Sequence, residues 1–310
     1  MTNRTIAIIG GGSIGVAFSV VFARAGFCVR VQEPDPQRRR EIPDDATRRL
    51  NSMHRYNLLN EPVETITKRI SVETELESAV AGVSLVQECV PERLDLKQQL
   101  FADIAEFTDD HCVVASSTSF IPSSESAEGS GIADRILVAH PGNPPYAIPV
   151  IELVPNPRTR PDIVDSAERI YQAAGMSPVR VAQEIEGFVF NRLQGALLRE
   201  AYALVRDGIA SVEDIDIVVR DGLGRRWAFM GPFETADLNT RGGIGAHAQN
   251  MGPSYHRMGL VRGDTSEWTP ELVAKVVAQR RQQLTLDDWE DRVAWRDEQL
   301  LRRIDQQPNS

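Results

Sequence analysis

Residues 5–18, TIAIIGGGSIGVAF, decide the fold of this chain. A short β-branched run stops at a glycine, and Gly10, Gly12 and Gly15 then form the pattern G-x-G-x-x-G at the start of a helix-like segment. The first glycine allows a tight turn, the second lets the backbone approach a pyrophosphate, and the third lets the helix pack against the strand. This context of strand, glycines and helix predicts a dinucleotide-binding turn.

Glu33 ends the next strand-like run, GFCVRVQE (26–33), eighteen residues after the last glycine of the turn. A carboxylate there accepts hydrogen bonds from a ribose hydroxyl and repels a 2′-phosphate, which favours NAD over NADP. The arginines at 38–40 weigh against NAD, because they can hold a 2′-phosphate, but we interpret them as a solvated helix face. The helix N-terminus adds Ser13 and Ile14 to the residues expected to contact the cofactor.

The N-terminal half repeats this strand–helix pattern. Apolar runs alternate with amphipathic segments, and the strand-like runs are 5–10, 26–33, 83–90, 112–119, 135–141, 150–155 and 177–184. Such alternation predicts βαβ units. We therefore expect an α/β fold whose N-terminal part is a Rossmann-type, doubly wound, mostly parallel sheet.

Strand signals fade after about residue 185, and the C-terminal part has all-α spacing. We expect an NAD-binding domain at 1–186 and a helical domain at 187–310. The longer predicted helices are 92–108, 187–208 and 211–223, the last with Ser211 as its N-cap.

Composition limits the possible partners and location. The net charge of -10 argues against nucleic acid as the main partner, because phosphate binding needs a basic face. The 3 cysteines are scattered without metal-ligand spacing, so we expect no metal site and a reducing compartment. No secretory signal pattern and no window of about 18 apolar residues is present. We expect a cytoplasmic protein with no membrane partner.

The segment QECVPERLDLK (87–97) places charged residues where a strand ends and a helix begins. Ligands bind at that edge of the sheet in doubly wound folds. Glu92 and Lys97 are therefore candidates to face the cofactor or the substrate. A salt bridge at the start of a surface helix accounts for these two residues equally well.

Uncharged polar side chains stand in two further segments of the chain. Ser117 and Ser119 belong to VVASSTSFIP (113–122), where another strand leaves the sheet, and they can bind a ligand, although helix capping is the simpler interpretation. Asn191 lies near the start of the predicted helix 187–208. Its amide can hydrogen-bond a substrate carbonyl or a histidine, but a polar helix residue needs no ligand.

His140 and Glu152 stand inside the largely apolar stretch LVAHPGNPPYAIPVIELVP (137–155). Burying a charge without a partner costs free energy, so burial of both residues is acceptable if their side chains pair with each other. If residues 141–149 connect adjacent strands, the glutamate can accept from one imidazole nitrogen and leave the other for a substrate hydroxyl. A core histidine satisfied by backbone, with the glutamate on a solvent edge, is an equal alternative.

In this order the segments resemble the L-3-hydroxyacyl-CoA dehydrogenase superfamily. The resemblance rests on the glycine turn, ECVPE with LK, SSTS, AHPGNPPYAIPVIELVP, GFVFNRLQ, GLGRRWAFMGPFET and WRDEQLLRR, which span nearly the whole chain. Within the superfamily the chain is most similar to the branch of L-gulonate 3-dehydrogenase and its relative lambda-crystallin. The resemblance implies a Rossmann-type domain, a helical domain that binds substrate and forms homodimers, and NAD-dependent oxidation of a secondary alcohol.

The resemblance also implies roles for single residues. It implies a catalytic histidine at His140 with its partner Glu152, a serine that contacts the substrate oxygen at Ser119, and a site asparagine at Asn191. The expected cofactor site then comprises Gly10, Gly12, Ser13, Ile14, Gly15, Glu33, Glu92, Lys97 and Ser117.

Departures from the relatives bear on the substrate. Ser117 stands where the acyl-CoA branch often has asparagine, and HPGNP (140–144) replaces HFFNP, so both favour the gulonate branch. Gly142 and Ala147 differ from the gulonate enzymes and bear on pocket size. A gulonate carboxylate also needs a cation, for which the candidates are Arg225, Arg226 and Arg241.

We therefore expect oxidation of L-gulonate to 3-dehydro-L-gulonate with a His–Glu pair as general base. One alternative is a dehydrogenase for 3-hydroxybutyryl-CoA, carnitine or another 3-hydroxy acid, although acyl-CoA phosphates need a basic surface. Another is a non-catalytic, crystallin-like NAD(H)-binding structural protein, which would not need the intact site residues.

Overall fold

The chain forms two compact units. The computed structural model describes residues 4–241 and 243–262 and, further on, 269–271, 274, 277–278, 282, 285 and 287–305. One unit comprises Met1–Arg192 with Val293–Ser310, and the other comprises Leu193–Arg292. The last stretch therefore joins the first unit, whereas the sequence pattern grouped it with the helices after residue 186. The reason is packing, because Leu301 is buried in the core of the first unit.

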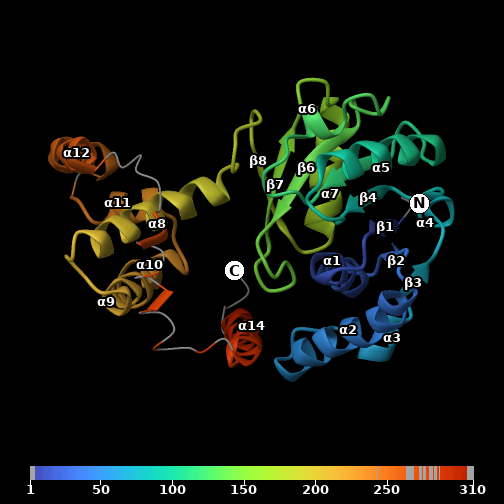
Figure 1. Cartoon of the computed structure of the whole chain (residues 1–310), viewed down its shortest axis with the longest axis horizontal. Helices are drawn as coiled ribbons and strands as arrows, with labels where there is room; N and C mark the ends of the chain where they lie inside the picture. The colour runs from blue at the N-terminus through green and yellow to red at the C-terminus, as the bar shows by residue number, and fades with distance from the viewer. Residues whose placement is uncertain are drawn as a thin grey trace. The chain divides into compact units, whose positions relative to one another are not determined.

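An eight-stranded sheet organises the first unit, in the order β3-β2-β1-β4-β5-β6-β7-β8 (Figure 1). All neighbouring strands are parallel except β6 and β7, which confirms the expected α/β class. One strand, β3, was not predicted, because its four residues ISVE include two polar ones. The strands are β1 (Thr5–Ile9), β2 (Cys28–Gln32), β3 (Ile70–Glu73), β4 (Leu85–Glu88), β5 (Val113–Ser116), β6 (Ile136–Pro141), β7 (Val150–Pro155) and β8 (Ser177–Arg180).

Helices cover both faces of this sheet (Figure 1). Successive side chains of a strand point to opposite faces, so β1 divides its apolar residues between two cores. Ile6 and Ile8 pack with α1, α2, α3 and α7, whereas Ala7 and Ile9 pack with α4 and α5. The helices of this unit are α1 (Ser13–Arg24), α2 (Pro36–Arg55), α3 (Val63–Thr67), α4 (Leu76–Val80), α5 (Leu94–Phe107), α6 (Ser123–Ser126), α7 (Pro161–Ala173) and most of α14 (Trp289–Asp305).

The described part of the second unit contains no strand, in agreement with the expected all-α character. The helix expected at 187–208 begins later, at Phe190, because Gly187 and Phe188 have positive φ. The helix expected at 211–223 keeps its Ser211 cap but changes to a π-helix at Val218. The elements are α8 (Phe190–Arg206), which starts in the first unit, α9 (Val212–Ile217), η1 (Val218–Leu223), α10 (Gly224–Trp227), α11 (Pro232–Leu238) and α12 (Gly243–Arg262).

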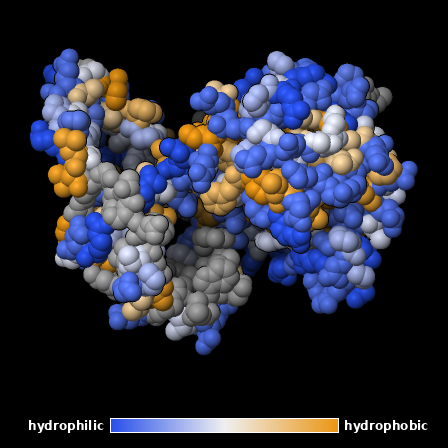
Figure 2. All heavy atoms as spheres, turned by 45° about the horizontal axis from the view of Figure 1, so that its top comes forward, coloured by the Kyte–Doolittle hydropathy of each residue, from blue (hydrophilic) through white to orange (hydrophobic). Residues whose placement is uncertain are grey.

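Few of the described side chains of the second unit are buried. Among its described residues, only Ala203, Val205 and Thr235 are buried. By contrast, Phe233 is 81% and Val261 80% exposed, and Figure 2 shows hydrophobic side chains (orange) at the surface of this unit. No helix in the described part of the chain is long and apolar enough to cross a membrane.

Candidate functional site

The glycine turn after β1 has the geometry that a dinucleotide phosphate needs. Gly10 has a φ of 99°, which favours glycine, and a Cβ at Gly15 would lie 1.9 Å from the carbonyl oxygen of Gly10. A Cβ at Gly12, by contrast, would meet nothing within 4 Å. This open space lies at the N-cap of α1, where the free N–H groups of a helix attract an anion. The turn therefore fits the phosphates of a dinucleotide.

Glu33 lies directly beside this turn. Its Oε2 accepts from the N–H of Gly11 at 2.8 Å, and its Oε1 accepts from the N–H of Asp35 at 3.0 Å. The carboxylate is thus fixed next to the place where the ribose of a dinucleotide is expected. Of the neighbouring arginines, Arg38 binds the carbonyl oxygen of Gly11 and two acidic side chains, Arg39 binds backbone oxygens, and Arg40 is exposed.

Arg49 is a contact of the turn that the sequence did not reveal. Its guanidinium donates to the carbonyl oxygen and to the Oγ of Ser13, at 2.9 and 3.2 Å. It also lies over the ring of Tyr146, 5.7 Å from the ring centroid, and burial lowers the pKa of Arg49. No local signal distinguishes it from the other arginines of α2, because its position depends on the packing of α2 against α1.

Lys97 and Glu88 form a buried ion pair at the end of β4. Both side chains are fully buried, and Nζ of Lys97 lies 2.8 and 2.9 Å from the two carboxylate oxygens of Glu88. Nζ also lies 3.4 Å from Oε2 of Glu92. Lys97 therefore supports the site from inside the protein, and its expected contact with the cofactor stays a prediction. Glu88 was missed, although an acid ending an apolar strand was a usable signal.

Glu92 connects this ion pair to the turn after β5. Its Oε1 accepts from the hydroxyl of Thr118 and from the N–H of Ser119, the latter at 3.2 Å. Burial raises the pKa of Glu92, but the Thr118 hydrogen bond and the charge of Lys97 outweigh it, so the pKa is lowered. Nδ2 of Asn191 donates to the carbonyl oxygen of Ser119 at 3.4 Å. The structure thus brings these predicted site residues together.

His140 and Glu152 form a hydrogen-bonded pair on the antiparallel strands. The two residues occupy directly paired positions of β6 and β7, and Nδ1 of His140 lies 2.8 Å from Oε2 of Glu152. They are 5% and 3% exposed, so the pair is inside the protein rather than on a solvent edge. Nε2 of His140 makes no hydrogen bond within the described residues, so it is available to a substrate hydroxyl.

The second oxygen of Glu152 holds the start of α8. Oε1 accepts from the N–H groups of Val189 and Phe190 at 2.7 and 2.9 Å. Burial raises the pKa of Glu152, but hydrogen bonds from His140 and these two N–H groups outweigh it and lower the pKa. An ionised Glu152 must accept from Nδ1, which places the ring proton there and leaves Nε2 as the basic nitrogen.

The loop between His140 and Glu152 packs into the core. Tyr146 and Ala147 are each 6% exposed and belong to the core on the α1 side of the sheet. A Cβ at Gly142 would lie 2.4 Å from Cγ2 of Ile148. Close packing inside the loop therefore explains the glycine at 142, and the small side chain at 147 fills core space.

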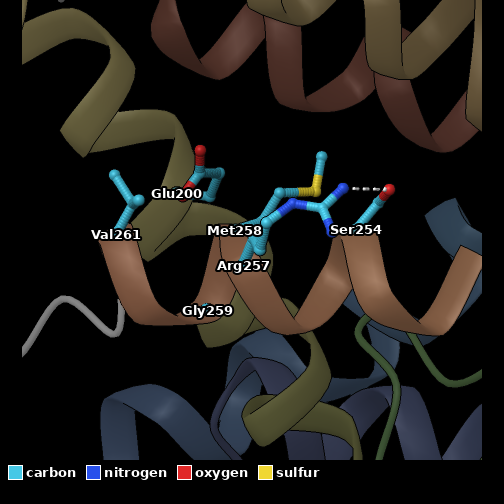
Figure 3. A pocket seen from close by; sticks show the side chains of 6 residues that line it. All are labelled: Glu200, Ser254, Arg257, Met258, Gly259 and Val261. Atoms are coloured by element: carbon cyan, nitrogen blue, oxygen red, sulfur yellow. Dashed lines mark hydrogen bonds between the residues drawn. The ribbon is translucent and has the colours of Figure 1, made fainter.

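The three arginines expected to hold a substrate carboxylate lie in the second unit. Arg225 and Arg226 are on α10, and Arg241 is exposed after α11. Their role toward substrate stays a prediction. A cavity of about 660 Å³ in this unit lies between α8 and α12 (Figure 3). None of the expected site residues lines it. Its lining consists of Glu200, Ser254, Arg257, Met258, Gly259 and Val261.

The chain matches two family models along nearly its whole length. The NAD binding domain of 3-hydroxyacyl-CoA dehydrogenase matches residues 5–185, and the C-terminal domain of the same enzyme matches residues 187–284. The first match contains the glycine turn, Glu33 and the His140–Glu152 pair. The second match begins at the turn before α8.

Individual proteins are similar over most of the chain. Lambda-crystallin of Oryctolagus cuniculus is 38% identical, covering 96% of this chain and 94% of the relative. L-carnitine dehydrogenase of Streptomyces griseus is 37% identical, covering 87% and 78%. Among solved structures, an NAD⁺-dependent 5-formyl-3-hydroxy-2-methylpyridine 4-carboxylic acid 5-dehydrogenase has 28% identity and a TM-score of 0.80, covering 97% of this chain and 98% of that chain.

Proposed function

The chain belongs to the 3-hydroxyacyl-CoA dehydrogenase family, as an NAD-dependent oxidoreductase that acts on CH–OH groups, and we propose that it oxidises the 3-hydroxyl of a small hydroxy acid. The substrate we propose is L-gulonate, which becomes 3-dehydro-L-gulonate. The observation that carries the proposal is the buried His140–Glu152 pair: Nδ1 lies 2.8 Å from Oε2, and Nε2 has no hydrogen bond among the described residues.

The residues of the site divide the chemical work. NAD, when bound at the glycine turn, supplies the hydride acceptor. Nε2 of His140 removes the hydroxyl proton, while Glu152 orients the imidazole and balances its positive charge. Ser119 and Asn191 hydrogen-bond the substrate oxygen as it becomes a carbonyl. Their shared link, from Nδ2 of Asn191 to the carbonyl oxygen of Ser119, supports their acting on one atom.

The test is NADH formation with L-gulonate, L-carnitine, 3-hydroxybutyrate and 3-hydroxybutyryl-CoA. A preference for gulonate supports the proposal, and a preference for another member of the panel replaces it. His140→Asn should lower kcat by about 10²–10⁴-fold, since that is the typical contribution of a general base. His111→Asn, at an exposed loop histidine, is the matched control. Wild-type turnover in His140→Asn would reject the proposed base.

Carnitine is the second candidate, because L-carnitine dehydrogenase of Streptomyces griseus is 37% identical to this chain. Both substrates carry a carboxylate, but carnitine also has a quaternary ammonium, so only carnitine needs an anionic or aromatic contact. If no substrate gives NADH while NADH still binds, a structural role like that of a crystallin becomes the better proposal.

A carboxylate substrate also needs a cationic anchor, and we assign this role to Arg226 with Arg225 and Arg241 as alternatives. The fork of a guanidinium binds a carboxylate through two parallel hydrogen bonds. Arg226→Met should therefore raise the KM for gulonate at nearly constant kcat. An unchanged KM would move the assignment to another arginine.

We also propose that a second copy of this chain covers the helical unit. Three buried side chains among the described residues of this unit are a small core for a unit of this length. A partner surface would cover exposed side chains such as Phe229 and Phe233, which are 73% and 81% exposed. Light scattering should show a dimer, and Phe233→Glu should weaken it; a wild-type monomer at all concentrations would reject this proposal.

A further inference from the structure

The turn that leads into α8 contains a strained residue. Gly187 and Phe188 follow each other in the left-handed region, with φ of 75° and 49°. Glycine adopts this conformation freely, but a bulky residue such as phenylalanine rarely does. Such a residue persists only where its surroundings hold it, and strain of this kind concentrates at functional sites.

The ring of Phe188 packs against the imidazole of His140. It is 1% exposed and belongs to a small buried cluster with Val138, Val154 and Val181. Its centroid lies 5.5 Å from the centroid of the His140 imidazole. Val138 and Val154 come from β6 and β7, the strands that carry His140 and Glu152, so the ring is fixed by the same strands as the pair.

The backbone around Phe188 serves the other member of the pair. The N–H of Phe188 donates to the carbonyl oxygen of Ile185 at 3.0 Å and closes the turn. The next two N–H groups, of Val189 and Phe190, then donate to Oε1 of Glu152 at 2.7 and 2.9 Å. A right-handed conformation at Phe188 would change the direction of both donors.

We propose that Phe188 is a positioning residue for the His140–Glu152 pair. Its side chain fixes the imidazole plane and keeps water from that side of the ring, and its left-handed backbone directs two donors at Glu152. With Oε1 occupied in this way, Oε2 is the oxygen that accepts the hydrogen bond from the N–H at Nδ1. The inference rests on the proposed function only for its effect on turnover, because the arrangement of the pair can be measured without substrate.

The test compares Phe188→Ala, Phe188→Leu and the control Val181→Ala. Val181 belongs to the same cluster and is 8% exposed, so its truncation removes packing from the cluster while the ring of Phe188 is retained. Nitrogen NMR of the full chain, labelled at histidine, reads the tautomer of His140, and the signal missing in His140→Asn gives the assignment. Phe188→Leu keeps most of the buried volume and provides the reading if Phe188→Ala fails to fold.

In the wild type we expect one tautomer with the proton on Nδ1. In the Phe188 variants the chemical shifts of Nδ1 and Nε2 of His140 should move toward each other. The kcat should fall by about 10–100-fold, since small displacements of a catalytic group have effects of this size. The Kd for NADH should stay within about twofold, because the glycine turn is a separate element. Val181→Ala should keep the wild-type tautomer.

A wild-type tautomer and kcat in both Phe188 variants would overturn the inference, and so would an equal change in Val181→Ala. If the tautomer changes as expected but the wild type oxidises no hydroxy acid, the proposed function fails and the positioning role stands. If the wild type is active and the Phe188 variants match it in both readings, the positioning role fails alone.

Discussion

Nδ1 of His140 lies 2.8 Å from Oε2 of Glu152, at directly paired positions of the antiparallel strands β6 and β7. Elsewhere the sheet is parallel, so this one reversal creates the pair. An antiparallel pair places opposite side chains within contact distance, whereas a parallel connection would need a long crossover. The short loop between these strands is therefore the element that makes a histidine–glutamate base possible.

Glu152→Gln tests the orienting role of the carboxylate. An amide cannot accept from Nδ1 and from both N–H groups at the start of α8 with one oxygen. If the oxygen stays with the N–H groups of Val189 and Phe190, the amide donates toward Nδ1 and the ring proton moves to Nε2. We expect kcat to fall by about 10²–10⁴-fold at saturating NAD, because the basic nitrogen is lost. A kcat within twofold of the wild type would contradict this role.

The stability contributed by Glu152 should depend on pH. Its pKa is lowered in the folded protein, because hydrogen bonds outweigh the opposing effect of burial. A lowered carboxyl pKa gives stability that is complete above the unfolded pKa and disappears as the pH falls through the folded pKa. Urea unfolding should therefore show the wild type more stable than Glu152→Gln at pH 7, with the difference shrinking below a pH of about 4. A difference that grows as the pH falls below about 4 would contradict the sign.

Gly12→Ala and Gly15→Ala separate cofactor binding from folding. A Cβ at Gly12 meets nothing within 4 Å in the protein, whereas a Cβ at Gly15 would lie 1.9 Å from the carbonyl oxygen of Gly10. Gly12→Ala should keep the wild-type Tm but weaken NADH binding by at least about tenfold, because its methyl group occupies the phosphate space. Gly15→Ala, by contrast, should both weaken NADH binding and lower the Tm. Unchanged NADH affinity in Gly12→Ala would place the phosphates elsewhere.

Glu33→Ser tests the choice between NAD and NADP. Removing the carboxylate removes a charged hydrogen-bond acceptor for the ribose and the repulsion of a 2′-phosphate. A charged hydrogen bond contributes about 1.5–3 kcal/mol, so the ratio of kcat/KM for NAD over NADP should fall by about 10–100-fold. Arg40→Gln, at an exposed position of α2, should leave the ratio unchanged. If Arg40→Gln alone shifts the ratio, the arginines rather than Glu33 select the cofactor.

Local pattern was sufficient for the sheet and for the glycine turn. Strand, glycines and helix are neighbours in the chain, and Glu33 ends the next strand, so short-range rules place all of them. The sequence predicted the His140–Glu152 pair only on the condition that residues 141–149 connect adjacent strands. The register of two antiparallel strands depends on how the loop between them folds. The start of α8 was predicted three residues too early, since nothing in a helical pattern reveals a left-handed phenylalanine.

Contacts between distant elements were beyond the sequence. Arg49 reaches Ser13 across 36 residues, and Lys97 reaches back across 9 to Glu88 in addition to its contact with Glu92. Both contacts depend on which face of α2 or α5 is buried. The spacing of apolar residues predicts the buried face of a helix, but it does not predict which polar group that face contacts.

The Lys97–Glu88 pair should be strongly coupled, because both side chains are fully buried. Removing one partner leaves an uncompensated charge, so Lys97→Met and Glu88→Gln should each destabilise the fold by about 3–5 kcal/mol. The double variant has no buried charge from this pair and should lose less than the sum of the single losses. Urea unfolding of the four proteins measures the coupling, with Gln99→Ala, on the same helix, as a control. If the losses in unfolding free energy of the two single variants add up to that of the double variant, the ammonium of Lys97 and the carboxylate of Glu88 are stabilised separately. Glu92 or the backbone would then balance their charges.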